Sequence, residues 1–592
     1  MCLLTLESQQ QDIGNLRARD TMNRDNNDNY KYSDNFYAEN RTNGSDILTR
    51  EPFDSNIHFN QNPNYEIEKG GSPGGTVNFE EAITLSGYGK FNYLLLLAIL
   101  PAAWACIFDS SSMPYALPSA ECDLNLSLFD KGLLNSMPFA GMIVTSFIWG
   151  FLTDTYGRKD ILAWGYLMTF IVSFSSSFAH TSWLLILFKF LGGIVISGPF
   201  AALMSYLAEV HGEKERTRIY MWLGVFFSLG NISMPCLAWL ILPQNINVSI
   251  FDSSFHLTSW RVFLIVCSIP ELTAFIALSW FPESPRFLLS KGRDDEALDV
   301  LRHIYHLNTG NDPKTFPVTS IKDEDFVKNN GKTLRECLNN GWEQMKPLFK
   351  APHIYKLLLI GSIQFCGTIG SSTIRLWMPQ LFAMIETYES THSKDTSKPS
   401  LCDMLQQTSG HNNTYQNNNS YNQTIIVDST CTPVILNSTV YLNSMVIALT
   451  GVIGYTLAGS LINCAGTKKL MVFCFLTAGS CCGTLYWAED SSGILGISSV
   501  FVALSSVGGA AVNNVIVDNF PTLLRAMAIS TTMMLGRVGA VTGNVLFPVL
   551  FNLSCLGPFI MIGIACIVCS ILVLFVPSKT SELKKSIKLN GK

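Results

Sequence analysis

The stretch Gly150-Phe-Leu-Thr-Asp154-Thr-Tyr-Gly157-Arg158-Lys159 has a worn copy later in the chain, Gly459-Ser-Leu-Ile-Asn463-Cys-Ala-Gly466-Thr467-Lys468. The two copies are 309 residues apart. A glycine in such a stretch permits a tight turn, and the basic side chains beside it can hold an acid or a helix C-terminus. The frame of glycine, acid and basic residues favours a gate contact over simple membrane anchoring.

A second pattern repeats at the same offset. Glu209 is followed seven residues later by Arg216, and Asp518 is followed by Arg525. One offset shared by two unrelated patterns indicates a duplicated module of roughly 200 residues, which is how many membrane carriers are built.

Hydropathy predicts a polytopic membrane protein. Of the 592 residues, 48% are apolar and 14% are charged, and the charges are concentrated in a few segments. The apolar runs reach the length of about 20 residues that crosses a bilayer core, where backbone groups must be satisfied within helices. We predict an all-α fold with twelve transmembrane helices in two six-helix halves, at about 93–118, 132–153, 161–179, 183–209, 218–242, 261–281, 354–384, 441–463, 470–488, 493–517, 525–550 and 556–576.

Basic residues in the short loops give the orientation. They lie in alternate loops, at 158–159, 214–218, 468–469 and 525, and the intervening loops are nearly free of lysine and arginine. The positive-inside rule then places both termini in the cytoplasm. The net charge of −5 gives no information about partners, and no basic stripe indicates binding to nucleic acid, so no nucleic-acid partner is expected.

The chain divides into five regions. Residues 1–85 are rich in Asn, Asp, Ser and Gly and are predicted to be a disordered cytoplasmic tail. The first half covers 86–286 and the second 353–577. Residues 287–352 form a cytoplasmic linker, in which the sequence from Arg293 has the apolar spacing of an amphipathic helix. A basic cytoplasmic tail, 578–592, follows.

The insertion 386–440 in the second half faces the exterior or lumen by the parity of the spans. It carries four N-x-Ser/Thr sequons, at Asn412, Asn418, Asn422 and Asn437, of which Asn437 is closest to a span. Cys402 and Cys431 share this oxidising side, which makes them a disulfide candidate, with Cys122 as a rival partner. No cysteine and histidine spacing indicates a metal site, and no cofactor motif is present.

These motifs resemble the major facilitator superfamily. The stretch at 150–159 looks like its loop between spans two and three, and Glu209 with Arg216 looks like the acid-and-arginine pair after span four of sugar porters. Pro282-Glu283-Ser-Pro285-Arg286 is similar to the sugar-porter signature after span six. The resemblance covers about residues 85–577 and implies alternating access, with these motifs as gates.

A narrower resemblance is to the synaptic vesicle glycoprotein 2 family. It rests on Leu117-Pro-Ser-Ala-Glu121, on Trp260-Arg261-Val-Phe263 and on the sequon-bearing loop. Organic-ion transporters carry their large exterior loop between spans one and two, where this chain has about a dozen residues. The chain departs from the pattern at Asn463 and Thr467, which replace an acid and an arginine, so the second gate is degenerate.

Ionisable residues at membrane depth are costly and are functional by default. Substrate or coupling candidates are Asp109, Lys189, Glu271, Arg375 and Arg537. Lys189 and Asp109 have an alternative role as a structural ion pair, Glu271 as a packing or exterior residue, and Arg375 as a cation that snorkels to the outer surface. In the organic-ion relatives, a charge at the depth of Arg537 faces the substrate cavity.

The sequence therefore predicts a carrier of a small organic solute rather than an enzyme. Three cations against two acids favour an anionic or zwitterionic solute, and a carboxyl that titrates with its partner is a candidate for a coupling proton. We expect a monomeric transport unit in a vesicle or plasma membrane. The alternatives are a non-transporting vesicle glycoprotein in trafficking or exocytosis and a plasma-membrane carrier of organic cations or carnitine.

Overall fold

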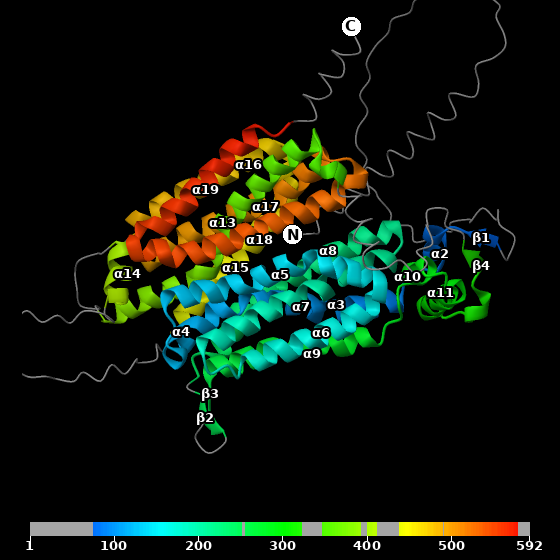
Figure 1. The fold of residues 1–592 in the computed structure, drawn as a ribbon, viewed down its shortest axis with the longest axis horizontal. Coiled ribbons are helices and arrows are strands. Elements are labelled where there is room, and N and C mark those ends of the chain that lie inside the picture. Colours follow the sequence, from blue (N-terminus) through cyan, green and yellow to red (C-terminus); the bar gives the residue numbers. More distant parts are fainter. Residues whose placement is uncertain are drawn as a thin grey trace, which may run out of the picture.

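The computed structural model describes residues 75–244, 246–250, 255–321, 346–391, 400–410, 437–488 and 490–577. Long helices dominate these ranges and run side by side in one bundle (Figure 1). The helices of the bundle are α3 (Lys90–Ser111), α4 (Met113–Leu124), α5 (Leu128–Tyr156), α6 (Arg158–Ser176), α7 (Ser182–Glu209), α8 (Glu213–Ile241), α9 (Ser259–Ser279), α13 (His353–Thr391), α15 (Ser438–Ala465), α16 (Thr467–Thr484), α17 (Ser491–Asn519), α18 (Thr522–Leu553) and α19 (Leu556–Leu574).

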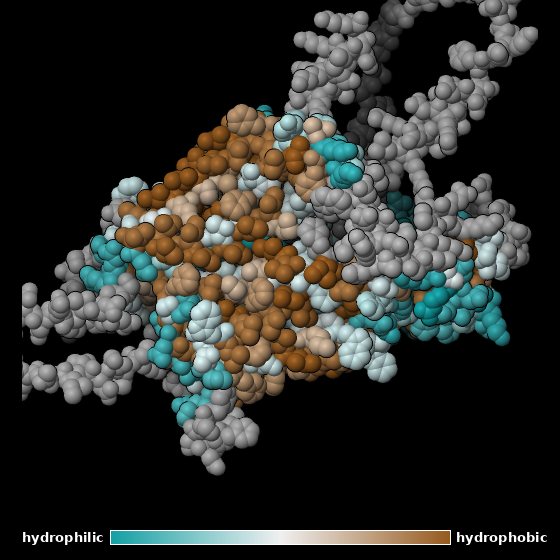
Figure 2. All heavy atoms as spheres, viewed as in Figure 1, coloured by the Kyte–Doolittle hydropathy of each residue, from teal (hydrophilic) through white to brown (hydrophobic). Residues whose placement is uncertain are grey.

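Each apolar run of the sequence coincides with one of these helices, once α3 and α4 are taken together. Nine helices in the described ranges are long and apolar enough to cross a membrane. The bent α5 would make ten, because its two parts, Leu128–Ser146 and Ile148–Tyr156, meet at 58°. Apolar side chains cover the middle of the bundle, and hydrophilic residues gather at its two ends (Figure 2). The protein is therefore a multi-pass membrane protein with an all-α fold.

The two ends of the bundle differ in what they carry. One end, the loop end, holds α4, the helix α14 (Leu401–Gly410) and the hairpin of β2 (Asn247–Ile250) with β3 (Phe255–Thr258) (Figure 1). The opposite end, the linker end, holds the short helices α10 (Pro285–Ser290) and α11 (Asp294–Thr309). The amphipathic helix predicted from Arg293 is confirmed as α11, which buries Ala297, Leu298, Leu301 and Ile304.

The two halves share a hydrophobic core only toward the loop end. There Phe108 and Leu134 of the first half belong to one buried cluster with Trp377 and Phe547 of the second. A Cβ on Gly132 of α5 would lie 2.7 Å from the Asn544 carbonyl oxygen of α18, so the two backbones approach closely. Toward the linker end the core divides into one cluster built from the first half and another built from the second.

The segment before α3 is folded onto the linker. Strand β1 (Gly75–Val77) pairs in parallel with β4 (Val318–Ile321), and α2 (Phe79–Leu85) packs with α10 and α11 in a small apolar cluster. The Asn308 side chain accepts the Phe91 N–H at 3.0 Å and donates to the Gly87 carbonyl at 2.8 Å, which fixes the junction of α2 with α3. The prediction of disorder through residue 85 is thus wrong for 75–85. Residues 1–74 and the tail 578–592 lie outside the described residues.

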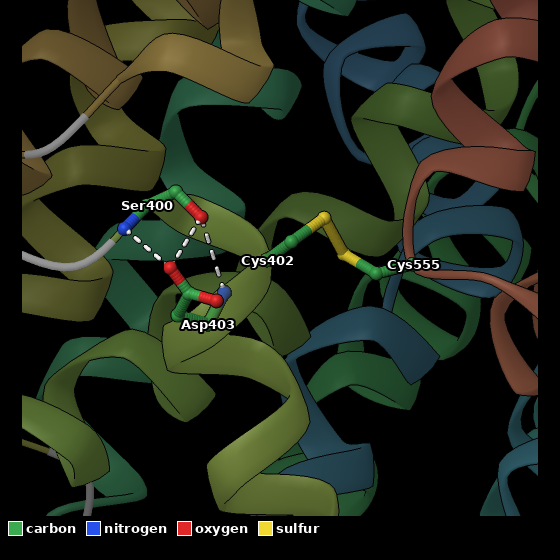
Figure 3. The surroundings of a disulfide bond; sticks show 4 residues. All are labelled: Ser400, Cys402, Asp403 and Cys555. Atoms are coloured by element: carbon green, nitrogen blue, oxygen red, sulfur yellow. Dashed lines mark hydrogen bonds between the residues drawn. A yellow bond between two sulfur atoms is a disulfide. The ribbon is translucent and has the colours of Figure 1, made fainter.

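The loop-end disulfide differs from the expected one. Cys402 of α14 is bonded to Cys555, between α18 and α19, and their Cα atoms are 5.7 Å apart (Figure 3). The predicted bond between Cys402 and Cys431 is therefore wrong. Cys555 follows the eleventh predicted span, so the parity of the spans already placed it on the same side as α14. Cys122 is also disulfide-bonded, and Cys431 lies outside the described residues.

Three of the four predicted glycosylation sites, Asn412, Asn418 and Asn422, also lie outside the described residues. Asn437 is described, and it begins α15 as the N-cap residue. Its side-chain amide donates to Glu386 at 2.6 Å, and the hydroxyl of Thr439, the third residue of the sequon, donates to the same carboxylate.

Candidate functional site

Arg158 is the centre of the ion-pair network at the linker end. It is the first residue of α6, and its guanidinium lies 3.0 Å from Asp154 and 3.1 Å from Glu209. Glu209 is buried at the end of α7, and its second carboxylate oxygen accepts the Ser284 hydroxyl. The guanidinium also lies over the Phe287 ring, 5.2 Å from its centroid. Arg158 thus joins α5, α7 and α10.

Glu283 satisfies the N-terminus of α6. Its carboxylate accepts the backbone N–H groups of Arg158 at 3.0 Å, Lys159 at 3.1 Å and Ser284 at 2.8 Å. Burial raises the pKa of Glu283, and the hydrogen bonds to these N–H groups act in the opposite direction. Gly157, with φ +106°, leaves the space that Glu283 fills, because a Cβ there would collide with the carboxylate.

Arg216 does not pair with Glu209, although the two form the repeated pattern of the sequence. Its Nε donates to the carbonyl oxygens of Ala208 at 2.6 Å and His211 at 2.9 Å, and its Nη2 forms an ion pair with Glu80 of α2. Arg216 therefore holds the end of α7 and joins it to the segment before α3.

Arg286 and Gly150 are two further predicted gate residues. The Arg286 guanidinium lies over the Phe79 ring of α2, 5.9 Å from its centroid. A Cβ on Gly150 would meet nothing within 4 Å. The contacts described for Arg158, Glu283 and Arg216 all lie within the first half, its linker and the segment before α3.

The equivalent residues of the second half make fewer contacts in the described part of the chain. Gly466 also has a positive φ, +80°, but a Cβ there would meet nothing within 4 Å. Lys468 donates to the carbonyl oxygens of Leu574 and Val576 at the end of α19. Arg525 is buried, and its Nε and Nη1 have no hydrogen-bond partner in the described part of the chain. Asp518 is exposed on the last turn of α17.

Three of the five intramembrane candidates meet in one buried cluster of the first half. Lys189 Nζ lies 4.0 Å from Asp109 and donates to Ser112 at 3.2 Å. The Ser173 hydroxyl is 3.3 Å from Asp109 and 3.0 Å from Glu271. All three charged residues are buried, so Glu271 is not an exterior residue. Arg261, which begins the same helix, forms an ion pair with Asp123. Two carboxyls thus share one ammonium group.

One oxygen of each acid, Asp109 Oδ2 and Glu271 Oε2, is buried and has no hydrogen-bond partner among the described residues. The sequence did not identify Ser173, whose hydroxyl links the two acids. A serine among apolar residues of α6 carries no signal by itself, because buried serines usually bond to their own helix backbone.

The other two candidates lie in the second half. Arg375 is exposed on α13, and Arg537 is partly buried on α18. Neither contacts the cluster of Asp109, Lys189 and Glu271 in the contacts described above. The charged candidates therefore separate into one buried group and two arginines on helices of the other half.

This architecture matches a known family. The model of the Major Facilitator Superfamily matches residues 99–397 and 429–591. The chain belongs to this superfamily. Its fold is similar to that of the xylose transporter XylE from E. coli in a partially occluded inward-open conformation, with a TM-score of 0.56 and 15% identity over 83% of this chain and all of that chain.

Curated relatives narrow the resemblance. The chain is 28% identical to synaptic vesicle glycoprotein 2B of Rattus norvegicus over 328 residues, which are 52% of this chain and 48% of that protein. It is 31% identical to synaptic vesicle glycoprotein 2C of the same organism over 328 residues, 52% of this chain and 45% of the relative. The aligned region thus spans about half the length of these relatives. The resemblance to the synaptic vesicle glycoprotein 2 family is confirmed.

Proposed function

We propose that this superfamily member carries a small organic solute across the membrane by rocking one six-helix half against the other. The observation that carries the proposal is the division of the core. Within the described ranges, the halves share buried apolar residues only toward the loop end and have separate cores toward the linker end. Such a pair of halves can pivot about the shared core and expose a central site to one side at a time.

The proposed orientation places the linker end and both termini in the cytoplasm, because the basic short loops lie there. The described conformation is then open inward. Because the relatives are synaptic vesicle glycoproteins, we propose a vesicle membrane as the location, with the plasma membrane as the alternative. We infer a single chain as the transport unit, since each chain supplies both halves.

The buried acids are the proposed site of a coupling proton. One ammonium group neutralises one of the carboxylates of Asp109 and Glu271, and a proton on the other would complete the balance. One protein of similar fold is a D-xylose-proton symporter, which supports a coupled proton in this fold. For the solute, we propose an anion or a zwitterion, because the arginines of the second half, Arg375 and Arg537, lie apart from these acids.

Uptake into proteoliposomes tests this proposal. The purified full chain would be reconstituted, and uptake from a panel of labelled organic anions, zwitterions, cations and sugars measured at several pH values. We expect Asp109→Asn to abolish the stimulation of uptake by an inward proton gradient and Arg537→Ala to lower uptake of the preferred solute. Asp299→Asn and Arg302→Ala on α11 are matched controls, since both side chains are on the exposed face of that helix. Unchanged uptake in both test variants contradicts the assignment.

A second candidate, a non-transporting vesicle glycoprotein, is favoured by one observation. The Nε and Nη1 of Arg525 have no hydrogen-bond partner among the described residues, and Thr467 stands where the first turn has an arginine, so the gate of the second half has fewer contacts than that of the first. A wild-type chain that binds no solute of the panel and shows no uptake would support this candidate. Preference for cations in the same panel would instead support the organic-cation carrier.

A further inference from the structure

Arg375 occupies an unusual place on α13. From Gln364 to Tyr388 the helix is buried or partly buried at every residue except Arg375, which is exposed. At 3.6 residues per turn, Arg375 lies on roughly the opposite side of α13 from the exposed residues Tyr355 and Ser362. Its exposure therefore continues no lipid-facing stripe, and the side chain opens into the interior of the bundle.

The neighbours of Arg375 come from both halves. Tyr115 of α4 and Tyr455 of α15 are close enough to interact with the guanidinium electrostatically. Tyr115 is in turn close to Cys236 of α8. Helix α13 contacts both α4 and α15, and α15 contacts α8. Arg375 thus lies where the two halves meet, beside Ile374 of the shared core.

The charge of Arg375 is not neutralised by the described residues. None of their carboxylates lies within 4.0 Å of its guanidinium, and none of their acceptors forms a hydrogen bond with it. Buried cations of the first half, in contrast, have carboxylate neighbours: Lys131 pairs with Glu121 at 2.7 Å, and Lys189 lies near Asp109. An arginine at membrane depth that faces the bundle interior without such a partner is by default a candidate for binding an anion.

We propose that Arg375, Tyr115 and Tyr455 form a binding site for the carboxylate of a small organic monoanion. The planar guanidinium presents a fork that matches a carboxylate, and the two phenol hydroxyls can donate to the same group. This inference rests on the proposed carrier function and names its solute class.

The site also has a mechanical consequence. Tyr115 belongs to the first half, and Arg375 and Tyr455 belong to the second. A carboxylate held by all three bridges the halves, so its binding stabilises conformations that bring α4 close to α13. The solute would then influence the rocking motion directly, without contact to the buried acids.

Equilibrium binding of benzoate tests the site, with benzamide as the neutral compound of the same shape. The full chain in lipid nanodiscs would be titrated by calorimetry. We expect benzoate to bind the wild type better than benzamide, and Arg375→Gln to weaken benzoate binding about tenfold or more, the ratio typical of a lost charge-assisted hydrogen bond. Arg375→Lys should weaken binding less than Arg375→Gln, and Tyr115→Phe and Tyr455→Phe by about threefold each. Arg302→Gln on α11 is the control and should bind benzoate as the wild type does.

Three results would overturn the site: benzoate affinity within about twofold of wild type in Arg375→Gln, equal binding of benzamide, or no benzoate binding up to about 10 mM. If Arg375→Gln does not fold, Arg375→Lys and Tyr455→Phe decide the question in the same way. Flux measurements separate this inference from the carrier proposal. Benzoate binding without transport contradicts only the carrier function, whereas transport without Arg375-dependent binding contradicts only the site.

Discussion

The turn between α5 and α6 and the turn between α15 and α16 occupy equivalent places in the two halves, yet they are stabilised differently. In the first, Arg158 has two carboxylate partners and Glu283 fills the space beside Gly157. In the second, Thr467 stands at the position of Arg158, and no atom of the described residues would lie within 4 Å of a Cβ on Gly466. Both turn glycines keep a positive φ, but among the described residues the carboxylate contacts beside the glycine are found only in the first half.

The difference indicates that side-chain contacts hold the linker end of the first half together more firmly than that of the second half. The network of the first half ties α5, α6, α7 and α10 together and extends through Arg216 to α2. The linker residues up to Ile321 are attached to the first half, since β4, α10 and α11 pack on the segment before α3, whereas Leu348 near the end of the linker packs in the core of the second half. The second half has no equivalent network in the described residues, so its linker end has fewer contacts that resist rearrangement.

The largest expected effect is that replacing Arg158 and replacing Arg525 change the stability of the protein in opposite directions. Arg158→Met leaves the buried Glu209 carboxylate without its cation, which should destabilise the protein by about 3 kcal/mol. Arg525→Met replaces a buried guanidinium that has two unpaired nitrogens with an apolar chain, which should be neutral or stabilise by about 1 kcal/mol. Thermal unfolding of both variants in one detergent checks this. Equal losses of melting temperature would show that the second network is as important as the first.

The second effect depends on pH. His211 is buried between α7 and α8, and burial lowers its pKa to about 4 from 6.5. Between these values the unfolded chain binds more protons than the folded one, so stability is complete above pH 6.5 and is lost as the pH falls toward 4. At about pH 5 the loss should reach about 2 kcal/mol.

The repeat supplies the matched variant for His211, because the residue 309 positions later is the buried Phe520. His211→Phe should remove most of the difference in melting temperature between about pH 7 and about pH 5. The same acid loss in wild type and His211→Phe would assign it to carboxyl groups such as Glu283 instead.

Particular residues show what the sequence could and could not predict about this comparison. Apolar runs located the helices, and the offset of 309 residues located both turns, because hydropathy and turn residues are local signals. The partner of Glu209 was not predictable. Arg158 and Arg216 are both plausible from the pattern, and only the packing of α6 against α7 selects Arg158.

Long-range partners account for the other differences from expectation. Cys402 pairs across 153 residues with Cys555, and Glu283 caps a helix that begins 125 residues earlier. The pairing of β1 with β4 joins a polar segment of low hydropathy to the linker, which composition alone presents as disordered. Such contacts depend on the relative placement of elements and leave no periodic trace in the sequence.

A smaller difference is expected between the losses of stability caused by alanine at the two turn glycines, Gly157 and Gly466. Alanine at either position is strained, because both have a positive φ, at a cost of about 2 kcal/mol. Gly157→Ala would also displace the Glu283 carboxylate from the N-terminus of α6, which adds about 1 kcal/mol. Thermal unfolding should therefore rank Gly157→Ala below Gly466→Ala. Combining Gly157→Ala with Glu283→Ala should remove most of the extra loss, and additive losses would contradict the collision.

The smallest effect tests whether the second turn can be repaired. Thr467→Arg restores the basic residue of the first turn, and Asp518 stands at the position equivalent to Glu209. Because Asp518 is exposed and Asn463 replaces the acid four residues before the new arginine, we expect a gain of at most about 0.5 kcal/mol. Thr467→Gln serves as the uncharged control for the added side-chain length. A gain in melting temperature that Thr467→Gln lacks and that disappears at high salt would identify an exposed ion pair. A gain in stability as large as the loss in Arg158→Met would instead mean that Thr467→Arg alone restores the contacts of the first turn in the second.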